Sequence, residues 1–230
     1  MTEVSGSLSN RKQTLLAMVE FALVAAVFVA DRRHLIPFSK TPFLLAVGWI
    51  SLRMRAMRWR HIGLRLYRSW PTTLALGAAV GISMELLDLF VTKIVLVRLT
   101  GRPPDLSDFL PIVGNLKLAI ASLVLAWVVA ALGEELVWRG YLMNRVAGLF
   151  GNGRASWLVS LLVVSALFGY AHSNQGTAGI FQEAFSGLLL GLAYLVCGRN
   201  LAVPIVAHGV TDSIDFILIY TGTYPGLPLR

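Results

Sequence analysis

The sequence predicts an all-α protein, a polytopic integral membrane helical bundle of about seven transmembrane helices, within a range of about six to eight. Of its 230 residues, 56% are hydrophobic and 14% are charged, and the mean hydropathy is +0.70. Soluble globular domains carry about 25% charged residues, so this chain is too apolar to be one. Its uncharged runs are continuous, whereas strands of a membrane barrel alternate apolar and polar residues over about ten positions. The lipid bilayer is therefore an expected partner.

The first predicted helix covers Gln13 to Ala30 and is interrupted only by Glu20. A secretory signal peptide is the alternative for such a run. It is disfavoured because charged residues, rather than a small-residue cleavage site, follow the run at positions 31–34. A shorter second helix is expected at Thr41–Leu52, and a third from Pro71 to Val97.

The loop between the second and third helices is strongly basic and contains no acidic residue. Loops of this kind stay on the cytoplasmic side of a membrane, which predicts a cytoplasmic N-terminus and a place in the bacterial cytoplasmic membrane. The net charge of +8 is then explained by membrane electrostatics, and no nucleic acid is expected as a partner. The loop arginines are Arg53, Arg55, Arg58, Arg60, Arg65 and Arg68.

The second half of the chain is expected to supply four more helices, which follow a proline-containing external loop from Gly101 to Gly114. A glycine-rich turn at positions 151–153 separates the fourth helix from the fifth. All helices are assigned to a single transmembrane domain, residues 1–230, in which residues 1–115 hold the N-terminal helices and basic loop and residues 116–222 the catalytic helices. The four ranges are Leu116–Ala147, Arg154–His172, Ala178–Gly198 and Leu201–Thr221.

Two glutamates and an arginine lie within the fourth helix, directly after an uncharged run. Ionisable groups are costly in lipid, so they indicate a functional site. Glu135 and Arg139 are four residues apart and can form an ion pair, while Glu134 projects about 100° away around the helix. We therefore expect Glu135 to support the structure and Glu134 to act on a water molecule or a metal. A polar clamp between helices is the alternative for this segment.

Two further helices carry polar groups to overlapping depths in the membrane. Counting about 1.5 Å per residue from the turn at 151–153, Glu134 and His172 lie at similar depth on neighbouring helices. His208 and Asp212 are four residues apart and share a helix face. Taken singly, His172 could be an interfacial residue, and His208 with Asp212 a helix-stabilising pair. Together the groups indicate one buried site, because each alone would lack a partner for its buried charge.

Three motifs in order, Glu134-Glu135-x-x-x-Arg139, Phe168-x-x-x-His172 and His208-x-x-x-Asp212, resemble those of the CPBP intramembrane protease family. This family includes the CAAX prenyl proteases and bacterial relatives linked to bacteriocin processing and self-immunity. The resemblance implies an endopeptidase in which Glu134 and His172 activate water. It also implies that His208 and Asp212 stabilise the oxyanion or bind a metal, with Glu135, Arg139 and Phe168 as structural support.

Asp212 departs from the prenyl-protease pattern, which typically has asparagine at this position. An ionised aspartate cannot donate a hydrogen bond to an oxyanion. Asp212 is therefore expected to be protonated, to orient His208, or to bind a metal. His172, His208 and Asp212 would make a three-ligand zinc set with Glu134 as the base. A metal-independent glutamate–histidine scheme is favoured, so zinc is the one cofactor left open.

The sequence therefore predicts an intramembrane endopeptidase that hydrolyses a peptide bond of a membrane-associated protein or peptide. A non-catalytic membrane-binding or immunity protein is the main alternative. A proton-coupled transporter is less favoured because the two halves of the chain share no repeat. The remaining acidic residues of the apolar runs are expected to have a structural role, such as neutralising nearby cations, and lining of the cavity is the alternative; they are Glu85, Asp88, Glu183 and Asp215.

Overall fold

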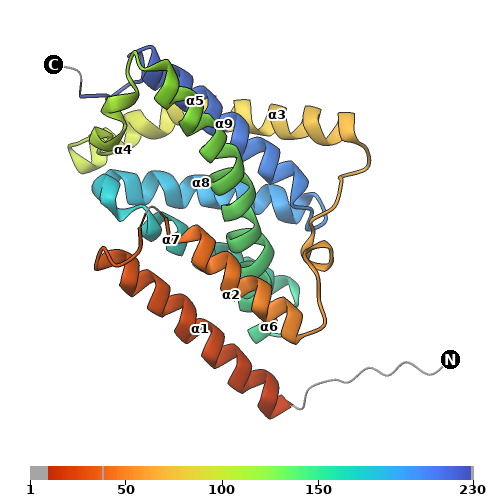
Figure 1. The fold of residues 1–230 in the computed structure, drawn as a ribbon. Helices are drawn as coiled ribbons and strands as arrows, with labels where there is room; N and C mark the ends of the chain where they lie inside the picture. Colours follow the sequence, from red (N-terminus) through yellow and green to blue (C-terminus); the bar gives the residue numbers. More distant parts are fainter. Residues whose placement is uncertain (1–9, 38, 229–230) are drawn as a thin grey trace. The chain divides into compact units, whose positions relative to one another are not determined.

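The computed structural model describes residues 10–37 and 39–228, and all regular structure within them is helical. The chain divides into two compact units, Met1–Met57 and Arg58–Arg230. Figure 1 shows the elements of both. The single domain expected over residues 1–230 stays a prediction. The cytoplasmic N-terminus also stays a prediction, because it falls on residues 1–9, outside the described residues.

The first unit contains α1 (Asn10–Arg32) and α2 (Thr41–Met54), which contact each other. Their ranges agree closely with the first two predicted helices. Glu20, the one charge inside the first predicted helix, forms an ion pair with Arg55 just beyond α2. The charge that interrupts the apolar run is therefore neutralised within the unit.

The second unit begins with a short 3-10 turn, η1 (Trp59–Ile62), followed by a long helix made of α3 (Trp70–Leu87), η2 (Asp88–Thr92) and α4 (Lys93–Thr100). Ser69 caps the start of α3, where its side chain accepts a hydrogen bond from the Thr72 backbone N–H. Gly101, with φ of 75°, ends α4 in the left-handed conformation that glycine adopts without strain. A connection containing the 3-10 turn η3 (Ser107–Ile112) follows, where the external loop is predicted.

The fourth predicted helix is one continuous helix composed of α5 (Leu116–Leu125), η4 (Ala126–Glu134), η5 (Leu136–Leu142) and α6 (Met143–Leu149). Both η4 and η5 have the wider π-helical turn, and they flank Glu135. The α-helical geometry assumed from the sequence is therefore wrong at this point. Wide turns of this kind are rare in proteins and are frequent at functional sites.

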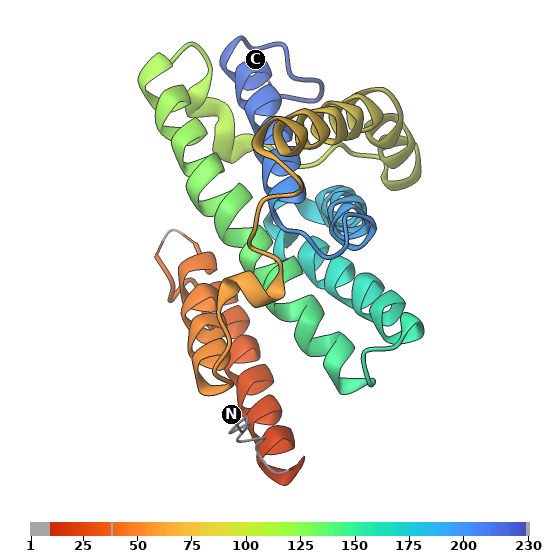
Figure 2. The ribbon, with the colours of Figure 1, turned by 90° about the vertical axis from the view of Figure 1, so that its right-hand side faces the viewer.

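Three more helices complete the unit: α7 (Arg154–Ala171), α8 (Gly176–Val196), preceded by the 3-10 turn η6 (Ser173–Gln175), and α9 (Ala202–Tyr220). The turn before α7 is the predicted one, with Gly151 and Asn152 both at positive φ. In this second unit α9 contacts α3, α5, η4 and α8, and it runs among them in both views (Figures 1 and 2).

Five of the helices are long and apolar enough to cross a membrane, and they all belong to the second unit. Only 22–39% of the most apolar window in each is buried, so large apolar side chains such as Val124, Leu125 and Val128 face outward. Exposed apolar surface on this scale suits lipid contact, and the chain is an integral membrane protein. α2 is a shorter apolar helix and α1 is not among the five; their crossing, and hence the total of about seven spans, stays a prediction. The five long helices are Trp70–Thr100, Leu116–Leu149, Arg154–Ala171, Ser173–Val196 and Ala202–Tyr220.

Glycines on α3 allow it to lie directly against α9. A Cβ atom added at Gly81 would lie 2.5 Å from the carbonyl oxygen of Ala207 and 3.0 Å from Cβ of Val210. One turn earlier, a Cβ atom at Gly77 would lie 2.5 Å from Cβ of Val206. Small residues four apart are a common means of close helix approach in membranes. This contact sets the position of α9 and so of His208.

We expect Gly81→Ala to lower the melting temperature by about 5 °C, because overpacking at a close helix contact costs about 1–3 kcal/mol. Gly148→Ala is the matched control, since no heavy atom lies within 4 Å of the added Cβ. The control should be neutral or stabilising by up to about 1 kcal/mol, because alanine favours helix. Thermal unfolding of the detergent-solubilised variants measures both, and equal melting temperatures would contradict the close contact.

Candidate active site

The side chain of Glu135 is buried in the second unit, and this residue is 0% exposed. Its Oε1 accepts a hydrogen bond of 2.6 Å from Nη1 of Arg139, as the i,i+4 spacing predicts. The same oxygen lies 2.9 Å from Nδ1 of His208 on α9. Because an ionised carboxylate can only accept, Nδ1 of His208 carries the proton in this contact. The first and third motifs are thus in direct contact across 73 residues of sequence.

Phe168, at the start of the second motif, packs between the other two motifs. Its ring lies 4.7 Å beneath the guanidinium carbon of Arg139 and 6.4 Å from the ring of His208. Arg139 also donates to the carbonyl oxygen of Gly187 on α8, at 3.0 Å. A Cβ atom at Gly187 would lie 3.1 Å from the Phe168 ring, so this glycine allows α8 to approach the cluster.

His208 has its second nitrogen, Nε2, 3.6 Å from Oδ1 of Asp212. This distance is too long for a hydrogen bond, and the contact is an ion pair only when the His208 ring is protonated. His208 therefore lies between two carboxyl groups: Glu135 faces Nδ1, and Asp212 faces Nε2 on the side of the pocket. The side chain of Glu135 is completely buried while that of Asp212 is 22% exposed, so only the Nε2 side of the ring is near accessible space.

His172 lies at the end of α7, and its ring is partly buried against Phe168, with ring centroids 4.8 Å apart. Its Nδ1 lies 2.8 Å from the Phe168 carbonyl oxygen. A carbonyl oxygen cannot donate, so Nδ1 holds a proton, and Nε2 is the ring nitrogen left for another partner. Glu134 is also partly buried, and it interacts electrostatically with Arg139, His208 and Asp212.

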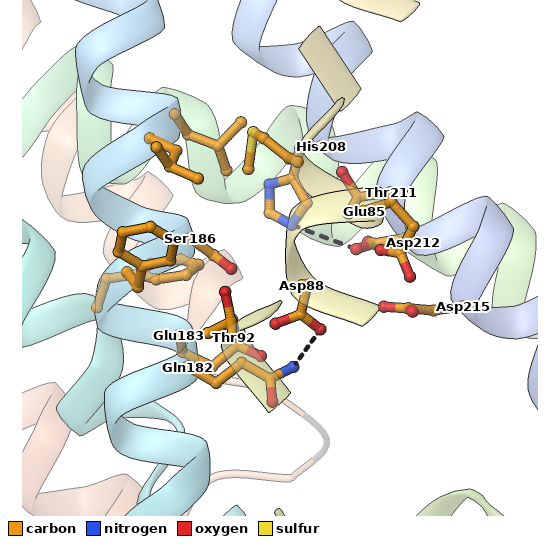
Figure 3. Close-up of a pocket in the computed structure, with 15 residues that line it drawn as sticks. Glu85, Asp88, Thr92, Gln182, Glu183, Ser186, His208, Thr211, Asp212 and Asp215 are labelled. Carbon is orange, nitrogen blue, oxygen red and sulfur yellow. Dashed lines mark hydrogen bonds and ion pairs between the residues drawn. The ribbon is translucent and has the colours of Figure 1, made fainter. Parts of the chain in front are cut away.

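A pocket opens beside His208 and Asp212, between the long helix that contains α3 and η2 on one side and α8 and α9 on the other (Figure 3). Phe168 also lines it, whereas Glu134 and His172 are not among its lining residues. The structure thus brings the third motif and part of the second to the pocket wall. The acidic residues that line the pocket are Glu85, Asp88, Glu183, Asp212 and Asp215.

Glu183, for which the sequence favours a structural role over lining of the cavity, lines the pocket. It interacts electrostatically with His172, His208 and Glu134, and is thus near members of all three motifs. Asp88 forms the expected ion pair with Lys93, at 2.8 Å, and also lines the pocket. The available sequence signal was an acidic residue inside an otherwise apolar helix, which is a functional indication by default.

The predicted zinc ligands do not form a metal site as they stand. Among the described residues, no group of three or more His, Cys, Asp and Glu side chains is arranged to hold a metal ion. Nδ1 of His208 is engaged by Glu135, and Nδ1 of His172 by a carbonyl oxygen. These contacts leave Nε2 of each ring as the nitrogen that could bind a metal, but the described side chains of His172, His208 and Asp212 are not gathered into such a group.

Residues 116–214 match the family model described as type II CAAX prenyl endopeptidase Rce1-like. The matched segment begins with α5 and ends within α9, so it contains all three motifs and confirms the resemblance drawn from them. No curated protein and no solved structure matches the chain. Residues 116–214 thus form a domain of the Rce1-like type II CAAX prenyl endopeptidase (CPBP) family, which is a family of proteases.

Proposed function

We propose that this protein is an intramembrane endopeptidase that hydrolyses a peptide bond of a membrane-associated protein or peptide. The observation that carries the proposal is the contact of Glu135 with both Arg139 and His208. Phe168 packs against Arg139 and His208. Residues of all three family motifs, which lie on three separate helices, meet there. A bundle that needed them only for stability would have no use for an imidazole nitrogen facing a pocket.

In this proposal Glu134 and His172 activate water. The Glu134 carboxylate takes a proton from the water molecule as its oxygen attacks the scissile carbonyl carbon. Nε2 of His172, the ring nitrogen that the Phe168 carbonyl leaves available, holds the water in position. The tetrahedral intermediate then collapses, the carbon–nitrogen bond breaks, and Glu134 returns the proton to the leaving amine.

His208 stabilises the negative charge that develops on the carbonyl oxygen. When the ring is protonated, Nδ1–H donates to Glu135 and Nε2–H is available to the oxyanion on the pocket side. Glu135 and Arg139 act as positioning residues, because they hold the ring through the Nδ1 contact. Asp212 keeps the Nε2 side polar as an ionic neighbour of His208.

The variant Asp212→Asn separates this scheme from its two alternatives. A neutral amide beside Nε2 of His208 leaves the oxyanion donor in place, so we expect activity to be kept or raised. If zinc were held by His172, His208 and Asp212, the amide would weaken a ligand, and activity and bound metal would fall together. If Asp212 serves only to orient His208, the rate should drop by about 10²–10⁴-fold with folding and metal content unchanged.

Three measurements on the purified variant are needed: the cleavage rate, the melting temperature and the metal content. Asp108→Asn, the same exchange on the exposed connection before α5, is the control for the loss of one carboxylate. Stoichiometric metal in the wild type that is lost from Asp212→Asn would contradict the metal-independent scheme.

A further inference from the structure

The pocket beside the proposed active site is unusually acidic for the interior of a membrane protein. Five carboxyl groups line it, and no lysine or arginine is among the described residues that do. They come from three helices. Glu85 and Asp88 lie on the long helix made of α3, η2 and α4, Glu183 on α8, and Asp212 and Asp215 on α9. The proposed mechanism uses only Asp212 among these. Burying a carboxylate away from water costs several kcal/mol unless a cation or donor compensates it.

The acidic wall contains buried acceptor atoms that have no donor. Glu85 is 2% exposed, and its Oε1 has no hydrogen-bond partner. Gln182 is 8% exposed; its Nε2 donates to Asp88 at 3.1 Å, while its Oε1 has no partner. Glu85 and Asp215 share a hydrogen bond, which requires one proton between the two carboxyl groups, but Oδ1 of Asp215 remains without a partner. All these atoms are acceptors, so only a donor would satisfy them.

Lys93 is a nearby cation, and it forms an ion pair with Asp88. Its Nζ lies 2.8 Å from Oδ2 of Asp88, donates to the hydroxyl of Tyr224 and lies 3.8 Å from the centre of the Tyr224 ring. Burial raises the pKa of the Tyr224 phenol, so Tyr224 is a neutral acceptor here. Lys93 therefore offsets one of the carboxylates and leaves the acidic excess in place.

We propose that this pocket is a substrate subsite for a basic side chain, an ammonium or guanidinium group of the peptide that is cleaved. Such a group has three to five N–H donors and a positive charge. Its donors would satisfy the unpartnered oxygens of Glu85, Gln182 and Asp215, and its charge would offset the acidic excess. The inference rests on the proposed endopeptidase function and adds a substrate class to it. Gln182 and Asp88, joined by the hydrogen bond drawn in Figure 3, are then the polar side chains next to the bound cation.

The distance from the proposed oxyanion donor limits where the basic residue can be. Asp215 follows His208 by seven residues on α9, which corresponds to about 10 Å along the helix axis. An extended peptide advances about 3.3–3.6 Å per residue. The basic residue should therefore lie within about three positions of the bond that is hydrolysed.

Paired synthetic peptides test the subsite. Purified full-length protein in lipid nanodiscs is incubated with a pool of defined peptides, each of which contains one lysine and has a twin with glutamine at that position. Mass spectrometry gives the ratio of kcat/KM for each lysine peptide and its twin. For lysines within three residues of the cut, we expect a ratio of about ten in the wild type and about one in Glu85→Gln/Asp215→Asn. Glu85→Gln alone should give an intermediate ratio.

The double variant Asp105→Asn/Asp108→Asn is the matched control, because it removes two carboxylates from the exposed connection before α5. It should keep the wild-type ratio. The proposed subsite would be refuted if the kcat/KM ratio were near one in the wild type. It would also be refuted if the ratio stayed at the wild-type value in Glu85→Gln/Asp215→Asn.

A binding measurement distinguishes failure of the subsite from failure of the proposed function. Fluorescently labelled twins are titrated onto Glu134→Gln, which should bind without cleaving. Tighter binding of the lysine twin by about tenfold supports the subsite even if the wild type cleaves nothing, an outcome that would refute only the endopeptidase function. Equal binding of the twins refutes the subsite alone.

Discussion

Glu134→Gln is expected to reduce peptide-bond cleavage by about 10²–10⁴-fold while leaving the helical bundle folded. The exchange keeps the shape of the side chain and removes its ability to take a proton from water. Glu134 is only partly buried, so the melting temperature should change by no more than about 2 °C. Comparison of protein termini in membranes from cells that make either the wild type or Glu134→Gln would reveal the substrate, and kinetics on that substrate would then measure the loss.

Asp108→Asn provides the control for this comparison, because it also converts a carboxylate to an amide but lies on an exposed connection. Its set of protein termini should be that of the wild type. If Glu134→Gln cleaved the identified substrate as fast as the wild type, the assignment of Glu134 as the base would be wrong.

Glu135→Gln should lose stability as well as activity. Arg139 is 1% exposed and Glu135 is 0% exposed, so the exchange removes the carboxylate to which the buried guanidinium donates. Breaking a buried pair in this way costs about 3–5 kcal/mol, which corresponds to a fall of about 10 °C in melting temperature. The amide can present either a donor or an acceptor to Nδ1 of His208, so it no longer determines which ring nitrogen carries the proton.

The double variant Glu135→Gln/Arg139→Met separates the two effects. Removal of both charges should recover most of the lost stability, because no uncompensated charge stays buried. Activity should remain low, since the carboxylate that holds His208 is still absent. A double variant that regained full activity would show that Glu135 supports the fold alone and does not position His208.

The contrast between the two glutamates also shows how much of the site was available from the sequence. The pairing of Glu135 with Arg139 is local, because residues four apart share a helix face whatever surrounds them. The contact between Glu135 and His208 is not local. It depends on how α9 and the long helix from α5 to α6 are rotated about their axes. A uniformly apolar membrane helix has no amphipathic pattern that would indicate this rotation.

The same reason explains why the sequence favours a structural role for acidic residues that line the pocket in the structure. Glu85, Glu183 and Asp215 lie in three separate apolar runs of the sequence. Only the approach of α3 to α9 at Gly77 and Gly81, together with the approach of α8, brings them to one pocket. The π-helical turns on either side of Glu135 were also missed, since the sequence around it contains no helix breaker.

The sequence by itself determined the all-α class, the bounds of the long apolar helices and the three motifs, because helix length, apolar runs and i,i+4 spacing are properties of neighbouring residues. The tertiary structure alone decided which faces of those helices meet. It placed His208 on Glu135, gathered an acidic pocket from three helices, and left the proposed zinc ligands without a common centre. These outcomes depend on close contacts between residues far apart in the chain, which packing energies select and local pattern does not encode.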